Sequence, residues 1–257
     1  MLEFVGLGLY DAKSVTIEGQ AAITQADVVF AEFYTSRLIG IDVAELEQAF
    51  GVSIQVRPRE GVEGDPSPIL DAAENAHVAF LTAGDPMIST THVDLRLRAH
   101  GRGIQTRIIH GITAETAASS LTGLQNYRFG PSTTLPIPYS EASPRVPENV
   151  IDTLDENQER GLHTIVFLDI QADQERFMTA DHGARLLASR YSQHLAVVVA
   201  RAGSPEPLVT ADRIEAIARQ SFGEPLHMLV LPGDLHHIER DALVAFANAP
   251  PSIIDSR

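Results

Sequence analysis

Cysteine is absent from the 257-residue sequence, and lysine occurs only once, at Lys13. Without cysteine the chain can form no disulfide, no thiolate metal site and no cysteine nucleophile, which excludes several classes of enzyme. The sequence also lacks any apolar run of about 18 residues or more, and no basic segment followed by an apolar stretch opens the chain. We therefore expect neither a membrane span nor a secretory signal, and we predict a cytoplasmic protein.

Basic side chains are outnumbered, because 19 lysines and arginines face 34 aspartates and glutamates, for a formal net charge of −15. A nucleic-acid partner calls for a basic face, so we expect none. An acidic, lysine-poor surface also suits concentrated salt, because salt screens the repulsion that such a charge creates. We interpret the composition as salt adaptation, and the alternative is an ordinary acidic protein.

The first half of the chain alternates short apolar runs with helical patterns, which indicates crossover units and a mostly parallel sheet. The pattern pauses around His110, and a new helix with a polar start follows. We therefore predict an N-terminal α/β domain over residues 1–110 and a C-terminal α/β domain over residues 111–257. The expected strands of the first domain are 3–5, 28–33, 54–57, 78–82 and 104–109, and its expected helices are 17–26, 43–50, 69–76 and 92–100.

In the second half, apolar runs predict strands at 133–137, 164–170, 195–200 and 227–231, and helical patterns cover 150–160, 180–191, 211–221 and 241–248. Prolines at positions 131, 136 and 138 would be poorly tolerated in a central strand, so the first of these strands should lie at an edge. Residues 138–147 carry three prolines and are expected to form a loop.

Two glycine-bearing corners end apolar runs in the first half, at Gly6-Leu7-Gly8 and at Gly84-Asp85-Pro86. Ligands of open α/β sheets bind outside the carboxyl ends of the strands, so the two corners suggest one pocket between them. The first corner has two of the three glycines of a dinucleotide fingerprint, with Asp11 where the third would be. No Gly-x-x-x-x-Gly-Lys sequence occurs, which makes a nucleoside triphosphate an unfavourable ligand.

Asp85 places a carboxylate where it would repel a phosphate, so a cationic or zwitterionic nucleoside fits the corner better. S-adenosylmethionine carries a sulfonium, an ammonium and ribose hydroxyls, which carboxylates and backbone carbonyls can face favourably. The alternative is that Asp85 caps the helix that follows it. His236 and His237 could suggest a metal, but adjacent side chains point apart and no third ligand is evident, so we expect no metal site.

Further segments carry a resemblance that covers nearly the whole chain. Together they resemble the diphthine synthases, a family of the tetrapyrrole methylase superfamily. The glycine corners recur widely in that superfamily, whereas residues 31–36, 123–127 and 161–170 are far more particular to diphthine synthases. The segments that carry the resemblance are 6–11, 31–36, 84–86 with 90–92, 123–127, 161–170 and 200–204.

The resemblance implies a two-domain α/β homodimer of tetrapyrrole-methylase type, with a mostly parallel N-terminal sheet and a mixed C-terminal sheet. It implies that S-adenosylmethionine binds in the cleft between the domains and that the enzyme N-methylates the aminocarboxypropyl-modified histidine of translation elongation factor 2. With the acidic composition, it also leads us to expect a salt-adapted archaeal source. By matching motif positions, the residues expected to contact the cofactor are Leu9, Asp85, Ile88, Thr113, Ala114, Leu168, Ala202 and His227.

Alternatives stay open at this point. A methyltransferase acting on a tetrapyrrole of the precorrin type would share the fold and the cofactor. A nicotinamide-dependent oxidoreductase is disfavoured by Asp11 and by the absence of a basic group at the corner, and a nucleoside-binding module would bind the cofactor without transferring a methyl group. His227 taken singly is more typical of a hydrogen-bonded structural histidine. For the substrate side of the reaction, our hypothesis names Glu32, Tyr34 and Asp169.

Overall fold

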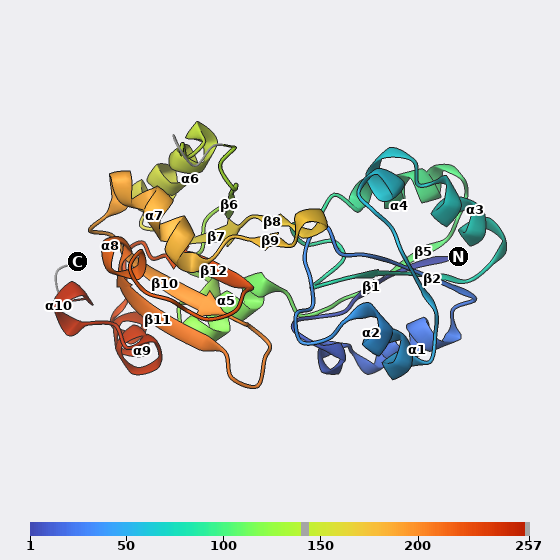
Figure 1. Ribbon diagram of the computed structural model, residues 1–257, viewed down its shortest axis with the longest axis horizontal. Coiled ribbons are helices and arrows are strands. Elements are labelled where there is room, and N and C mark those ends of the chain that lie inside the picture. The colour runs from blue at the N-terminus through green and yellow to red at the C-terminus, as the bar shows by residue number, and fades with distance from the viewer. Residues whose placement is uncertain (140–143, 255–257) are drawn as a thin grey trace. The chain divides into compact units, whose positions relative to one another are not determined.

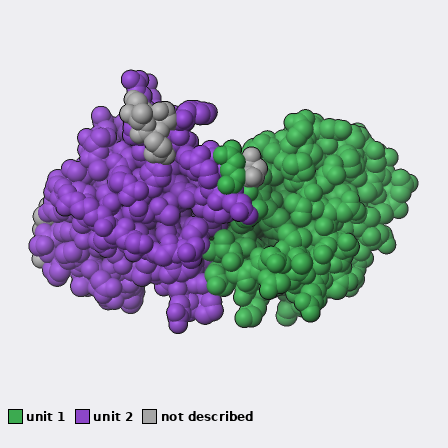
Figure 2. Space-filling model, in the orientation of Figure 1, with its two compact units in different colours: residues 1–114, 172–174 green, residues 115–171, 175–257 purple. Residues whose placement is uncertain are grey.

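The computed structural model describes residues 1–139 and 144–254 (Figure 1). The chain divides into two compact units, which Figure 2 shows in different colours. Unit 1 consists of residues 1–114 and 172–174, and unit 2 consists of residues 115–171 and 175–257. Among the described helices, none has both the length and the apolar character that a membrane span needs.

The core of unit 1 is a five-stranded sheet in which every pairing is parallel, as the alternation of strands and helices predicted. Its strands stand in the order β3-β2-β4-β1-β5, so the first and fourth strands of the chain are neighbours. The strands are β1 (Leu2–Gly6), β2 (Val28–Glu32), β3 (Ile54–Val56), β4 (Val78–Thr82) and β5 (Thr106–Ile109).

Helices cover both faces of this sheet (Figure 1). α1 (Ile17–Gln25) and α2 (Val43–Phe50) pack on one face, and α3 (Ser67–Asn75) and α4 (Val93–Gly101) pack on the other. The strands are therefore buried on both sides, which explains their continuous apolar sequences. Local sequence sets the helix starts: Thr16 accepts a hydrogen bond from the Gly19 amide, and Asp42 and Glu45 form a reciprocal capping box.

Unit 2 contains a second five-stranded sheet, in the order β11-β10-β12-β7-β6. β6 and β7 are parallel and the other pairs are antiparallel, which confirms the expected mixed sheet. β6 lies at the edge, as its flanking prolines predicted. The strands are β6 (Thr133–Leu135), β7 (Thr164–Leu168), β10 (Leu195–Ala200), β11 (Leu208–Arg213) and β12 (His227–Leu231).

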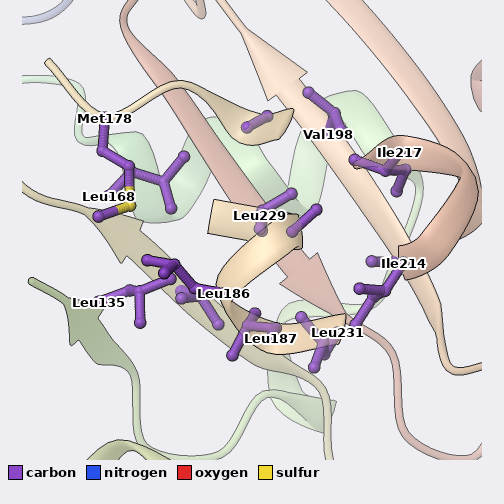
Figure 3. Packing of buried hydrophobic residues seen from close by; sticks show 14 of the residues in the cluster. Leu135, Leu168, Met178, Leu186, Leu187, Val198, Ile214, Ile217, Leu229 and Leu231 are labelled. Carbon is purple, nitrogen blue, oxygen red and sulfur yellow. The ribbon is translucent and has the colours of Figure 1, made fainter. Parts of the chain in front are cut away.

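The main core of unit 2 lies between this sheet and three helices, α6 (Glu148–Glu159), α7 (Ala180–Tyr191) and α8 (Ile214–Ile217). Figure 3 shows how the leucine and isoleucine side chains of α7 and α8 meet those of the strands. A short antiparallel pair, β8 (Ile170–Gln171) and β9 (Arg176–Phe177), follows β7. The remaining helices are α5 (Ala114–Thr122), α9 (His237–Ala247) and α10 (Pro251–Ile254).

The predicted helix over residues 211–221 is wrong in its first part. Residues up to Arg213 belong to β11, and α8 covers only Ile214–Ile217. All six residues of β11 pair with β10, from Leu195 opposite Arg213 to Ala200 opposite Leu208, and this pairing with the preceding strand overrides the local helical pattern. In the predicted loop 138–147, residues 140–143 lie outside the described residues, and the described residues beside them form no helix or strand.

Candidate functional site

The two glycine corners of unit 1 are joined directly at the carboxyl ends of β1 and β4. The Gly8 amide donates to the Gly84 carbonyl oxygen at 3.1 Å, and the Gly84 amide donates to the Gly8 carbonyl oxygen at 2.7 Å. The Leu7 amide donates to the Thr82 carbonyl oxygen at 2.8 Å. The pairing of β1 with β4 thus continues past the strand ends into both turns.

Glycine is required here for two physical reasons. A Cβ atom on Gly6 would lie 2.5 Å from the Gly111 nitrogen and 2.6 Å from the Gly84 carbonyl oxygen, so a side chain would collide with backbone atoms of two other loops. Gly8 has a φ of 71°, in the left-handed region that other residues rarely adopt. The loops after β1, β4 and β5 therefore meet backbone to backbone at this edge of the sheet.

Asp85 ties two of these loops together. Its side chain is 3% exposed, and it accepts hydrogen bonds from the Met87 amide at 2.9 Å, the Gly111 amide at 3.2 Å and His110 Nδ1 at 2.8 Å. The alternative role as a helix cap is wrong, because the next helix, α4, begins only at Val93. Asp85 instead fixes its own turn and anchors the loop that follows β5.

The other predicted cofactor residues of unit 1 lie on the same edge, because β4, β1 and β5 are adjacent and parallel. Leu9 follows β1 and is half-buried, and its carbonyl oxygen accepts from Ser14 Oγ at 2.6 Å. Ile88 follows β4 and keeps its apolar side chain 44% exposed. Thr113 and Ala114 follow β5 and are half-buried. The structure thus brings all five unit 1 candidates to one edge, four of them in loops and Ala114 as the first residue of α5.

The three candidates of unit 2 also share an edge of their sheet. Leu168 ends β7, Ala202 follows β10, and His227 begins β12. β12 runs antiparallel to both β7 and β10, so its first residue lies beside the last residues of its two neighbours. The Arg201 amide donates to the Leu226 carbonyl oxygen at 2.8 Å, which holds the turn after β10 against the start of β12.

Both ring nitrogens of His227 are occupied within unit 2. Nδ1 accepts from the Ala180 amide, at the start of α7, at 3.1 Å, so the ring hydrogen is on Nε2, which donates to the Glu224 carbonyl oxygen at 2.9 Å. Burial lowers the pKa of His227 below its ordinary value, with the Glu224 hydrogen bond opposing the shift. His227 is therefore a neutral imidazole that holds the start of α7.

Comparisons with known proteins agree with the resemblance. The family model for tetrapyrrole (corrin/porphyrin) methylases matches residues 1–218. A diphthine synthase of Halorubrum lacusprofundi is 61% identical over 99% of this chain and 100% of the relative, and one of Methanosarcina acetivorans is 46% identical over 99% of each. A crystal structure of a diphthine synthase superposes with a TM-score of 0.91 at 37% identity, covering 99% of this chain and 98% of that one. The chain belongs to the diphthine synthase family.

Two segments that are particular to diphthine synthases, 123–127 and 161–170, meet in unit 2 around a buried carboxylate. Glu239, in the first turn of α9, accepts from the Gln125 amide at 2.9 Å, from the His236 amide at 2.8 Å and from His163 Nε2 at 3.0 Å. His163 is fully buried, and its Nδ1 accepts from the Gly233 amide at 3.0 Å. These hydrogen bonds lower the pKa of Glu239 even though burial opposes the shift. The network fixes both segments relative to α9.

The third such segment, 31–36, ends β2 in unit 1 and contains two of the substrate-side candidates. Glu32 is fully buried, and Tyr34 is half-buried with the Arg59 guanidinium 4.7 Å from the centre of its ring. The remaining candidate, Asp169 of unit 2, accepts from the Ile137 amide at 2.9 Å, which fixes the end of β7 against the residues after β6. Glu32 accepts from the Tyr34 amide at 3.0 Å and the Thr35 amide at 3.1 Å, so Glu32 and Asp169 both hold the backbone at strand ends.

Sequence reasoning missed His110, His163 and Glu239. His110 could be placed beside Asp85 only from the strand order, which puts β5 next to β1 and which no local pattern reveals. Glu239 carried a weak signal, since it stands three residues after the N-cap His236 of α9, at the capping-box spacing. The expectation that His236 and His237 point apart is wrong, because their ring centres lie 4.0 Å apart with the ring planes tilted by 44°. Across residues 1–139 and 144–254, no group of three possible ligands gathers in a way that could hold a metal ion.

Proposed function

We propose that this chain is an S-adenosylmethionine-dependent methyltransferase that N-methylates the aminocarboxypropyl-modified histidine of elongation factor 2, which yields diphthine. The observation that supports this proposal most directly is the match to diphthine synthases, at 61% and 46% identity over 99% of this chain. The segments most particular to that family are also built into specific buried networks here, around Glu239 and Glu32. These family-specific segments therefore contribute to the buried hydrogen-bond networks of the chain.

The residues at the two sheet edges suit S-adenosylmethionine in chemical type. In unit 1, the left-handed turn at Gly84 has open space beside its Cα, because a Cβ there would meet no atom within 4 Å. Ile88 offers an exposed apolar side chain for the adenine, and the backbone carbonyls of the turns offer acceptors for hydroxyls and for the ammonium. We propose that Leu9, Asp85, Ile88, Thr113 and Ala114 bind it from unit 1, together with Leu168, Ala202 and His227 from unit 2.

Methyl transfer from a sulfonium asks mainly for alignment. The cofactor supplies an electrophilic methyl group, and the nucleophile is a neutral amine of the substrate. The protein must hold the amine in line with the methyl carbon and exclude water, and each round also needs an acceptor for the proton that the amine loses. The close backbone packing of Gly6, Gly84 and Gly111 restrains the unit 1 loops, which would help to hold the cofactor in a fixed position for this alignment.

Assembly and location follow from the same proposal. We infer a homodimer, and the exposed apolar side chains of α9, Ile238 at 55%, Val244 at 40% and Phe246 at 61%, would gain from being covered by a second copy. Sedimentation equilibrium measures the assembly, and a monomer at all concentrations would exclude it. Because the proposed substrate acts in translation, the enzyme would work in the cytoplasm.

Labelled methyl transfer tests the proposal. The chain is incubated with methyl-labelled S-adenosylmethionine and either elongation factor 2 carrying the modified histidine or a precorrin intermediate. We expect label only in the protein. Label only in the tetrapyrrole would replace the assignment with the precorrin-type alternative, and binding of S-adenosylmethionine without any transfer would favour a nucleoside-binding module.

A further inference from the structure

His110 stands directly after β5, where the three glycine-bearing loops of unit 1 meet. β5 ends at Ile109 and is an edge strand of the sheet, with β1 as its neighbour. The next residue, Gly111, is packed so closely that a Cβ atom there would collide with the Gly84 carbonyl oxygen and lie 2.9 Å from Gly6 Cα. An imidazole is therefore fixed one residue away from the corner where we propose that the cofactor binds.

The ring of His110 is oriented by a buried carboxylate. Its Nδ1 atom lies 2.8 Å from Asp85 Oδ2, and the Asp85 side chain is 3% exposed. Both Asp85 oxygens also accept from backbone amides, Oδ1 from Met87 at 2.9 Å and Oδ2 from Gly111 at 3.2 Å. Because these oxygens act as acceptors, His110 Nδ1 carries the hydrogen and donates it. In the neutral ring, Nε2 then holds the lone pair.

The Nε2 atom of His110 is open to approach from solvent. The side chain is 76% exposed, and Asp85 is its one partner among the described residues. A pairing with so exposed a side chain contributes little to stability, so the fold does not depend on this histidine. A basic nitrogen that faces outward, on a ring held from the other side by a carboxylate, is the arrangement of a general base.

The other titratable candidates at the strand ends are less suited to take up a proton. Glu32 is fully buried, and His227 uses both of its ring nitrogens within unit 2. Asp169 accepts from the Ile137 amide at 2.9 Å, and a carboxylate is a much weaker base than an imidazole. His110 is therefore the group best placed to exchange a proton with a substrate at the unit 1 edge.

We propose that His110 is the catalytic base of the methyl transfer, with Nε2 taking a proton from the substrate amine in each round and Asp85 positioning the ring. This inference rests on the proposed function. An α-amino group is largely protonated near neutral pH, so the ammonium first gives one proton to Nε2. The freed lone pair then bonds the methyl carbon, and the carbon–sulfur bond breaks with its electrons left on sulfur. The imidazolium releases its proton to solvent before the next round.

Two variants of His110 separate base catalysis from loop anchoring. His110→Ala removes the ring and the hydrogen bond, whereas His110→Asn keeps a side-chain N–H that can donate to Asp85 but has no basic nitrogen. The matched control is His77→Ala. His77 also pairs with a buried carboxylate, that of Glu3 at 2.7 Å, but it precedes β4 at the opposite end of the sheet, and Glu3 keeps its ion pair with Arg107.

The assay measures the single-turnover rate of the first methyl transfer near pH 7, with saturating S-adenosylmethionine and elongation factor 2 that carries the modified histidine. We expect this rate to fall about 10²-fold in both His110 variants, with the melting temperature and the Kd for S-adenosylmethionine unchanged. His77→Ala should keep the wild-type rate. Added imidazole should restore much of the rate of His110→Ala, because the exposed site admits a small base. Pyrazole, a ring of the same size that is far less basic, should not.

The base assignment is overturned by a wild-type rate in His110→Ala or His110→Asn, or by an equal loss in His77→Ala. It is also overturned if added imidazole leaves the rate of His110→Ala unchanged, or if pyrazole restores it equally well, because the ring would then act through its shape. Failure of the wild type to methylate the factor at all would instead overturn the proposed function.

Discussion

Replacing Asp85 with alanine should weaken both the fold of unit 1 and cofactor binding. The substitution leaves the Met87 and Gly111 amides without the acceptor that they now share, in a site that is 4% exposed. Hydrogen bonds to a charged group contribute about 1.5–3 kcal/mol each, whereas the His110 ring is 76% exposed, so its pairing adds less than about 1 kcal/mol. For the two amide hydrogen bonds together, we expect the free energy of unfolding to fall by about 3–6 kcal/mol.

If Asp85 also contributes one charged hydrogen bond to the cofactor, its loss raises the Kd for S-adenosylmethionine about 10-fold to 150-fold. Urea unfolding measures the first effect, and titration calorimetry at a temperature where the variant is folded measures the second. Asp85→Asn serves as the matched variant, because one oxygen remains to accept from Met87 while the amide group opposes the Gly111 N–H. An unchanged Kd beside a lowered stability would show that Asp85 acts only in the fold, and unchanged stability would refute the hydrogen-bond reasoning itself.

Three further outcomes follow from the structure. Burial lowers the pKa values of His163 and His227, so their contribution to stability is complete above about pH 6.5 and is lost as pH falls through the folded-state pKa values. His227→Asn keeps an acceptor for the Ala180 amide, so in urea unfolding its free energy of unfolding should fall less steeply with decreasing pH than that of the wild type. An unchanged pH dependence would mean that His227 does not titrate as described. Glu239→Ala should cost about 3–5 kcal/mol by leaving three donors unpaired in the interior, and a loss below about 1 kcal/mol in chemical unfolding would contradict the network's role. The melting temperature should rise from dilute buffer to molar KCl, because salt screens a net charge of −15, and the 61% identical relative comes from a halophilic archaeon. A flat or falling melting temperature would contradict the salt-adaptation interpretation.

The elements of unit 1 could be predicted from sequence because each is encoded locally. Its parallel strands are buried on both faces and so appear as short apolar runs such as 78–82, and its helices have polar starts such as Asp42. β11 could not be predicted in the same way. Apart from Ala211 its residues are only partly buried, and they become a strand by pairing with β10, which lies outside the segment 211–221 whose pattern was interpreted.

The candidate site shows the same division. The glycines of the unit 1 corners were recognisable, because close backbone approach and positive φ admit little else. The partners of Asp85 were not, since His110 and Gly111 reach it only through the order of the strands. For His227 the sequence left both a structural role and a cofactor contact open, and only the structure shows that both of its ring nitrogens are engaged within unit 2.

The most direct test of the central claim is to locate the transferred methyl groups on elongation factor 2. After reaction with labelled S-adenosylmethionine, the factor is digested and its peptides are analysed by mass spectrometry, alongside a factor that lacks the aminocarboxypropyl group. We predict label on the amino nitrogen of the modified histidine and none on the unmodified factor. Label at any other residue, or equal labelling of the unmodified factor, would contradict the proposed function.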